Sequence, residues 1–209
     1  MNLPNRLSLF RIFVIPIFLL CLLWDQFFET SQLVTGLIRM VALVLAIVVT
    51  VTDYLDGSIA RKHGICTRLG QLLDPLADKV FITAALVGLV ELKVIPAWTV
   101  VLVIAREFLV TGLRAIAADA GQSFGADRLG KHKTGWQLGL IITAVLVVAV
   151  RDLLMSQGIW PATAPDSRPF ELVFQVMVLI PLVVALVLTV LSGLNYLMAH
   201  RGLLTEDPV

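Results

Sequence analysis

Long apolar runs, broken by few polar positions, make up most of this chain. Six such stretches can be distinguished, near residues 8–28, 34–60, 75–94, 95–118, 134–151 and 171–199. Each approaches the roughly 20 residues that a helix rising about 1.5 Å per residue needs to cross a bilayer. No Ser/Gly/Pro-rich linker divides them into domains. The pattern predicts an all-α integral membrane protein, with residues 1–209 forming a single bundle of six transmembrane helices.

The composition agrees with this prediction. Hydrophobic residues make up 58% of the chain and charged residues 15%, with a mean hydropathy of +0.93. A soluble domain would carry about 25% charged residues. The net charge of +1 gives no electrostatic reason to expect nucleic acid as a partner. Cys21 and Cys66 lie in different segments without metal or redox spacing, so we interpret both as apolar side chains.

The lysines and arginines predict the orientation of the bundle. With six spans, one side of the membrane would carry Arg6, Arg11, Arg61, Lys62, Arg68, Lys79, Arg106, Arg114, Arg128, Lys131, Lys133 and Arg201. The other side would carry Arg39, Lys93, Arg151 and Arg168. Because basic residues accumulate on the cytoplasmic side of membrane proteins, we expect both termini to be cytoplasmic.

Four acidic residues depart from the apolar pattern. Asp53 and Asp56 are three positions apart, and Asp74 and Asp78 are four apart. Either spacing places a pair on one face of a helix, one turn apart. The first pair ends the second apolar stretch and the second pair opens the third, so a reversal of the chain at Gly64 and Gly70 could bring the pairs face to face at the cytoplasmic end of the bundle.

Four converging carboxylates at a membrane boundary require compensation. Each unpaired acid near the hydrocarbon centre costs about 2.5–3.5 kcal/mol, and the four would repel one another. Divalent cations remove both problems, and ligands that are all oxygen favour hard ions such as Mg²⁺, Mn²⁺ or Ca²⁺. Two ions held by four carboxylates is an arrangement that stabilises phosphoryl displacement.

An alternative interpretation needs no metal. The acids could be helix caps or solvated positions, neutralised by neighbouring basic residues, namely Arg61, Lys62, Arg68 and Lys79. That interpretation leaves unexplained why four acids at helical spacing are accompanied by Gly57 and Ala60, whose missing side chains leave room for a ligand to approach the backbone.

The same stretch resembles the CDP-alcohol phosphotransferase family. It matches the family pattern D-x2-D-G-x2-A-R-x8-G-x3-D-x3-D in both residue type and spacing, through Asp53, Asp56, Gly57, Ala60, Arg61, Gly70, Asp74 and Asp78. Members of the family have six transmembrane helices, usually form homodimers, and transfer a CMP-linked phosphoryl group from a CDP-alcohol to an acceptor hydroxyl. The resemblance implies the same activity here.

The resemblance also implies roles for individual residues. Asp53, Asp56 and Asp74 would hold two divalent ions, Mg²⁺ or Mn²⁺, while Asp78 would be both a metal ligand and the general base. The cytidine diphosphate would contact a second set of positions, namely Asp56, Gly57, Ala60, Arg61, Thr67 and Gly70.

The acceptor is indicated by further motifs and by charge. The segments "NLPNRLSLFRIF", "AREFLVTGLR" and "LGKHKTGWQ" resemble the branch of the family that makes phosphatidylglycerophosphate from CDP-diacylglycerol and sn-glycerol 3-phosphate. Independently, the basic residues Arg106, Arg114, Lys131 and Lys133 lie on the same predicted side as the aspartates, where they could bind the phosphate of the acceptor. Glu107 interrupts the fourth stretch beside Arg106 and could partly compensate Arg114, seven positions on. The branch implies a bacterial inner membrane.

Other hypotheses stay open at this point. A sister enzyme could use serine, inositol phosphate or phosphatidylglycerol as acceptor, although an uncharged or zwitterionic acceptor would leave the basic cluster without a role. A cation transporter would hold its acids near the bilayer midplane rather than at one end. A purely structural membrane subunit would not account for the four acids.

Overall fold

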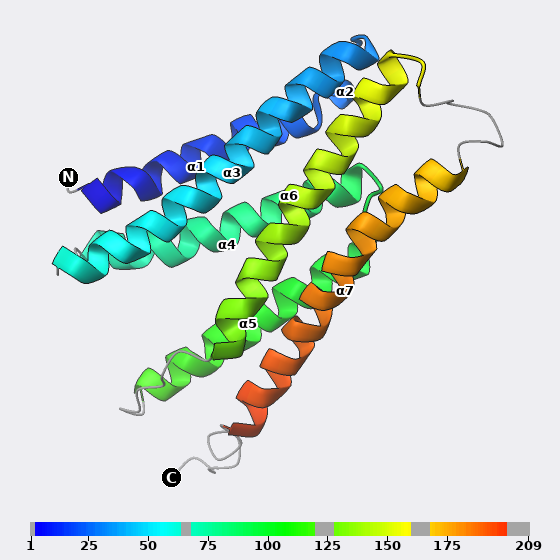
Figure 1. Cartoon of the computed structure of the whole chain (residues 1–209). Coiled ribbons are helices and arrows are strands. Elements are labelled where there is room, and N and C mark those ends of the chain that lie inside the picture. Colours follow the sequence, from blue (N-terminus) through cyan, green and yellow to red (C-terminus); the bar gives the residue numbers. More distant parts are fainter. Residues whose placement is uncertain (1–2, 64–67, 120–127, 160–167, 200–209) are drawn as a thin grey trace.

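The structure is all-helical throughout the residues that it describes. The computed structural model describes residues 3–63, 68–119, 128–159 and 168–199, and these contain no strand. The helices, labelled in Figure 1, are α1 (Leu3–Leu22), α2 (Trp24–Phe27), α3 (Gln32–His63), α4 (Arg68–Glu91), α5 (Ala97–Asp119), α6 (Arg128–Ser156) and α7 (Arg168–Ala199). The all-α prediction is therefore confirmed. The first apolar stretch divides into α1 and the single turn of α2, which are separated at Leu23.

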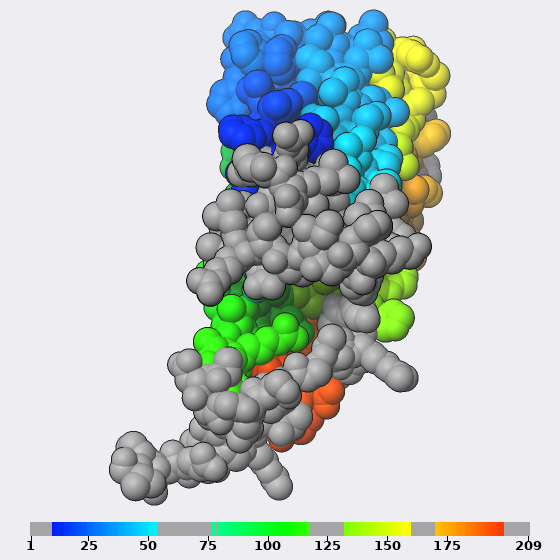
Figure 2. All heavy atoms as spheres, turned by 90° about the vertical axis from the view of Figure 1, so that its left-hand side faces the viewer, coloured from blue at the N-terminus to red at the C-terminus, as the bar shows by residue number. Residues whose placement is uncertain are grey.

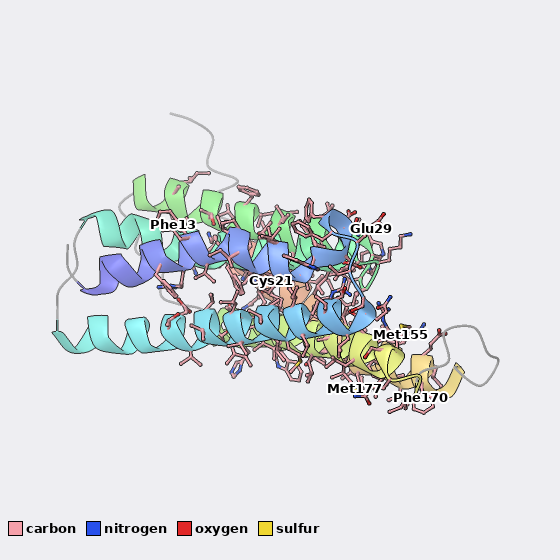
Figure 3. The ribbon with its side chains drawn as sticks, turned by 90° about the horizontal axis from the view of Figure 1, so that it is seen from above. Phe13, Cys21, Glu29, Met155, Phe170 and Met177 are labelled. Atoms are coloured by element: carbon pink, nitrogen blue, oxygen red, sulfur yellow. The ribbon has the colours of Figure 1, made fainter. Side chains whose placement is uncertain are left out.

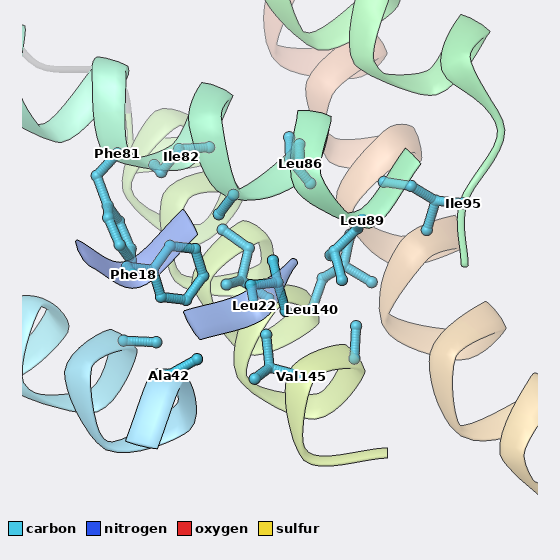
Figure 4. Packing of buried hydrophobic residues seen from close by; sticks show 14 of the residues in the cluster. Phe18, Leu22, Ala42, Phe81, Ile82, Leu86, Leu89, Ile95, Leu140 and Val145 are labelled. Carbon is cyan, nitrogen blue, oxygen red and sulfur yellow. The ribbon is translucent and has the colours of Figure 1, made fainter. Parts of the chain in front are cut away.

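The core lies where α1, α3, α4 and α6 meet. α3 packs most extensively against α6, α6 also packs against α7, and α1 lies against both α3 and α4. At the centre the rings of Phe18 and Phe81 are 5.4 Å apart, and Leu22, Leu89 and Leu140 are buried around them (Figure 4). Close packing of these side chains fixes the order of the helices.

The outward faces of the helices are apolar as well. Phe108 is 74% exposed, and Val101 and Met198 are each 65% exposed. Soluble proteins do not cover their surface with such side chains, whereas lipid tails solvate them. In the described residues, three stretches are long and apolar enough to cross a membrane, Gln32–Asp53, His132–Ser156 and Phe170–Met198, and Phe10–Leu22 is a shorter apolar stretch. The chain is an integral membrane protein.

The bundle has two distinct ends. α3 ends and α4 begins at one end, which we call the Asp53 end. Figure 2 views the molecule from this end, with α1 and α3 above the described parts of α5 and α7. α4 and α6 finish at the opposite end, which we call the Arg151 end. Figure 3 places Glu29 and Met155 there.

A buried ionic network ties four helices together near the Arg151 end. The guanidinium of Arg39 pairs with Asp152, lies 2.5 Å from Oδ1 of Asp25, and donates from Nε to the carbonyl oxygen of Leu22 at 3.0 Å. Arg39 and Asp152 are each only 2% exposed. The network joins the end of α1, α2, α3 and α6. Sequence reasoning had assigned Arg39 to membrane topology and missed its partners, because Asp152 is 113 positions away.

Candidate active site

The four motif aspartates lie on the last part of α3 and the first part of α4, at the Asp53 end. Asp53 and Asp56 belong to α3, and Asp74 and Asp78 belong to α4. Four further motif residues are helical too, with Gly57, Ala60 and Arg61 on α3 and Gly70 on α4. Among all eight motif positions, only Asp53 has a described side chain, and the predicted nucleotide contact Thr67 lies outside the described residues altogether.

Asp53 forms an ion pair with Arg11 of α1. Arg11 is 1% exposed, while the side chain of Asp53 is 39% exposed. The ion pair links α1 to α3 beside the motif. It also places a buried cation in a region whose sequence is rich in acidic residues. A partly exposed carboxylate at this position is the kind of oxygen donor that hard divalent ions prefer, so Asp53 fits the predicted metal site chemically.

Two of the predicted acceptor-binding residues meet at one carboxylate. Glu107 of α5 pairs with Lys133 of α6 and lies 3.2 Å from Nη1 of Arg106. Lys133 is 3% exposed, and the side chain of Arg106 is 13% exposed. A lysine is rarely buried to this extent unless it is paired. The structure therefore joins α5 and α6 through a positively charged cluster of Arg106, Glu107 and Lys133, which we call the basic cluster.

A hydrogen-bond relay connects the basic cluster to the helix of Asp78. Nζ of Lys79, the residue after Asp78, donates to Oγ1 of Thr111 at 2.6 Å. The hydroxyl of Thr111 donates in turn to the carbonyl oxygen of Glu107 at 2.7 Å. Through these bonds, the part of α4 that carries Asp78 lies beside the part of α5 that carries the cluster. The motif and the cluster thus occupy adjoining segments.

The other two predicted acceptor-binding residues are placed differently. Arg114 is exposed and lies over the ring of Tyr196 on α7, with its guanidinium carbon 5.7 Å from the ring centroid. Such a contact between a cation and an aromatic face contributes about 0.5–1 kcal/mol at an exposed site. Lys131 belongs to α6, but its side chain lies outside the described residues.

Sequence reasoning missed two features of the site. It did not identify Arg11 as the partner of Asp53, or Lys133 as the partner of Glu107. Both pairs join residues far apart in the chain, by 42 and 26 positions. The one available signal was the presence of charged residues inside apolar stretches, which indicates an internal partner without specifying which.

Comparison with known proteins gives a consistent result over nearly the whole chain. Residues 1–201 match the model of the CDP-alcohol phosphatidyltransferase family. The chain is 38% identical over 200 residues to a CDP-diacylglycerol–glycerol-3-phosphate 3-phosphatidyltransferase of Bacillus subtilis, an overlap of 93% of each protein. It is 34% identical over 212 residues to the protein of that name from Salmonella paratyphi A, covering 99% of this chain and 98% of the relative. A probable phosphatidylglycerophosphate synthase of Mycobacterium tuberculosis is 32% identical over 195 residues, covering 93% of this chain and 79% of the relative.

Proposed function

The chain belongs to the CDP-alcohol phosphatidyltransferase family, and we propose that it transfers the phosphatidyl group of CDP-diacylglycerol to sn-glycerol 3-phosphate, releasing CMP. The names of its full-length relatives support this donor and this acceptor. The observation that carries the choice of acceptor is the positively charged cluster of the buried Lys133 with the partly exposed Arg106 and Glu107, hydrogen-bonded to the helix of Asp78 through Lys79 and Thr111.

In the proposed reaction, a hydroxyl oxygen of glycerol 3-phosphate attacks the phosphorus that carries the diacylglycerol. A new phosphorus–oxygen bond forms to glycerol, and the bond between that phosphorus and the phosphate of CMP breaks. CMP leaves with the bonding electrons. Asp78 accepts the proton of the attacking hydroxyl, a role for which a carboxylate must lie within hydrogen-bonding reach of the acceptor.

Asp53, Asp56, Asp74 and Asp78 would hold two divalent ions, Mg²⁺ or Mn²⁺. Bound there, the ions would neutralise the diphosphate and stabilise the charge that develops on the leaving CMP. The partly exposed carboxylate of Asp53 supports this assignment, and its pairing with Arg11 is consistent with an acidic region that attracts cations.

The nucleotide would bind beside the metals. Gly57, Ala60 and Gly70 carry little or no side chain and would let the cytidine diphosphate approach the backbone of α3 and α4. Arg61 would contact the phosphates, and Asp56 and Thr67 would complete the set of contacts. Because the donor is a lipid, its acyl chains would stay in the bilayer while its headgroup enters the site.

The acceptor phosphate would bind at the basic cluster. Arg106 and Lys133 meet at the carboxylate of Glu107, which places two cationic donors close enough together for one phosphate to bind both. Lys131 precedes Lys133 on α6, and Arg114 lies two turns beyond Arg106 on α5; both would strengthen the local positive potential. Charge-assisted hydrogen bonds to phosphate are among the strongest that a protein makes.

We further propose that α1 and α3–α7 each cross the membrane, with the Asp53 end and both termini in the cytoplasm. The six helices of at least 20 residues in the described chain support the count, and the distribution of Lys and Arg supports the orientation. The bacterial relatives support the inner membrane as the location. Resemblance to the family supports a homodimer.

The proposed function can be tested with the purified protein, CDP-diacylglycerol and Mg²⁺ or Mn²⁺. CMP release is measured with glycerol 3-phosphate, serine, inositol phosphate or phosphatidylglycerol as the acceptor. We expect release with glycerol 3-phosphate and background values with the other three. Release with another acceptor, and none with glycerol 3-phosphate, would overturn the proposed acceptor but keep the family chemistry.

A further inference from the structure

A cavity of about 600 Å³ lies at the Arg151 end, far from the proposed active site. It is bounded by the turn after α4, the last part of α6 and the first part of α7, and Figure 3 shows Met155, one of its lining residues, at this end. Arg39, near this end, and Asp53 are 14 positions apart on α3, which corresponds to about 21 Å at the helical rise. The cavity is therefore separate from the aspartate motif.

The inner wall of the cavity is apolar and its mouth opens outward. Val148, Val178 and Leu182 are buried along the wall, whereas Leu179 lines the cavity and is 53% exposed. The volume falls within the range of about 300–1,000 Å³ that is common for small-molecule sites. An apolar recess that opens on the outer surface of a membrane protein is accessible to a lipid acyl chain.

Charged groups also line this cavity. Lys93, Arg151 and Glu171 line it, which gives two cations against one acid. Nε of Arg151 is buried without a hydrogen-bond partner among the described residues, and it lies 3.7 Å from Oδ1 of Asp152, whose other oxygen is paired with Arg39. A buried donor without a hydrogen-bond partner is unfavourable, so an incoming acceptor at this position is favoured.

Lys93 occupies its position at a conformational cost. It has a φ of 58°, in the left-handed region that favours glycine. The backbone N–H of Lys93 donates to the carbonyl oxygen of Val90, and the backbone N–H of Val94 donates to the carbonyl oxygen of Leu89. These two hydrogen bonds form the Schellman motif that ends many helices. The same arrangement ends α6, where the equivalent residue is Gly158 with a φ of 68°. A lysine is less stable than glycine in this conformation, which suggests that its charge has a use.

We propose that this cavity binds an anionic phospholipid of the leaflet opposite the active site. An acyl chain lies along Val178 and Leu182, and the lipid phosphate accepts hydrogen bonds from Lys93 and from Nε of Arg151. Lys93 and Arg151 supply two cationic donors for the lipid phosphate, and Glu171 is the one acidic residue among the described side chains that line the cavity. This site goes beyond the proposed function, because it is at the other end of the bundle from the motif.

The test measures lipid binding rather than activity. Phosphatidylserine, an anionic lipid that is neither substrate nor product of the proposed reaction, is titrated against the detergent-purified full chain, and bound lipid is counted by native mass spectrometry. Lys93→Asn combined with Arg151→Gln should weaken binding by about tenfold or more, since a charge-assisted hydrogen bond corresponds to at least that factor. Phosphatidylcholine should bind more weakly to the natural protein than phosphatidylserine does.

One single variant and one matched pair of variants make the test specific. Asn tolerates the left-handed conformation of residue 93, so Lys93→Asn alone should fold and still weaken binding. Leu179→Trp should obstruct the mouth and reduce binding, whereas Ile180→Trp, an exposed neighbour outside the cavity lining, should not. Equal binding by the natural protein and the double variant would overturn the proposal, as would equal losses in the two Trp variants.

Discussion

Lys133 is the residue on which the choice of acceptor depends most. It is buried and charged, and it shares the carboxylate of Glu107 with Arg106. Its ammonium and the guanidinium of Arg106 place two cationic donors side by side. A phosphate could bind both donors, so the ammonium of Lys133 should contribute to acceptor binding and little to donor binding.

Replacing Lys133 with alanine should therefore separate the two substrates kinetically. We expect the KM for glycerol 3-phosphate to rise by about ten- to a hundredfold, the factor that corresponds to one lost charge-assisted hydrogen bond, while the KM for CDP-diacylglycerol changes little. Lys133→Arg, which keeps the charge, serves as the control and should lose less. A parallel rise in both KM values would instead indicate a general disturbance of the site.

Asp78 is the proposed general base, and its replacement tests that role. Asp78→Asn keeps the size of the side chain but cannot accept the proton, so CMP release should fall to the background while the helical content by circular dichroism stays unchanged. Glu29→Gln, an exposed change at the Arg151 end, should keep full activity. Full activity of Asp78→Asn would remove this residue as the base.

Single residues also show where sequence reasoning reached its limit. Arg106 could be selected because a charge inside an apolar stretch is expensive and therefore indicates a partner, and Lys133 because it lies on the same predicted side as the aspartates. The partner itself is set by which helices pack together, which no local pattern specifies. That is why Glu107 was expected to compensate Arg114, on its own helix, while the structure pairs it with Lys133 of α6.

At the scale of the elements, α6 packs closely against α3 at Gly36. A Cβ added there would lie 2.9 Å from Cγ of Leu153 and 3.1 Å from its backbone nitrogen. At Gly88 of α4 the nearest neighbours of an added Cβ are the terminal methyl groups of Leu22 and Leu19, at 2.8 and 3.3 Å. A backbone atom cannot move aside, but a terminal methyl group can rotate.

These two glycines should respond differently to alanine. Gly36→Ala should destabilise the bundle by about 1–3 kcal/mol through overpacking. Gly88→Ala should be close to neutral, because a gain of about 1 kcal/mol in helix propensity offsets the repacking of two leucine side chains. Thermal unfolding in detergent, followed by circular dichroism, measures both. A lower transition temperature for Gly88→Ala than for Gly36→Ala would contradict this interpretation of the α3–α6 contact.

The buried pair of Arg39 and Asp152 should hold α3 and α6 together. Asp152→Asn should cost about 3 kcal/mol, because it leaves a buried arginine with one fewer counter-charge. The double change of Arg39→Met and Asp152→Leu should cost less than the sum of the two single changes, since neither charge is then left uncompensated. The same unfolding experiment checks this, and strictly additive effects would show that the pair contributes no coupling.

The elements themselves could be foreseen from hydrophobic length, but their ends could not. α4 begins at Arg68 and α6 at Arg128, each several residues before the apolar stretch that predicts it. Their first turns are polar, so they carry no hydropathy signal. The break at Leu23 between α1 and α2 could not be predicted from hydropathy either, because the residues before it are apolar. The short helix α2 packs against α3, and a local sequence pattern does not specify such a contact.

At the scale of the whole molecule, the two ends of the bundle differ in chemistry. The Asp53 end carries the motif aspartates and, on adjoining helices, a positively charged cluster, whereas the Arg151 end carries a buried ionic network and a separate cavity. Under the proposed function, the reaction takes place at the Asp53 end, while the ionic network at the Arg151 end holds the helices together. The sequence predicted the reactive end through its motif, but the other end lacks any motif and became apparent only from packing.

The central claim is that the motif and the basic cluster form one site that joins CDP-diacylglycerol to glycerol 3-phosphate. The most direct measurement quantifies CMP and the product lipid together, by mass spectrometry, in liposomes containing the purified protein, CDP-diacylglycerol and a divalent ion. The account predicts equal amounts of CMP and phosphatidylglycerophosphate, with both lost in Asp78→Asn and both reduced in Lys133→Ala at low glycerol 3-phosphate. CMP release without phosphatidylglycerophosphate, or equal product formation by Lys133→Ala at low acceptor concentration, would contradict it.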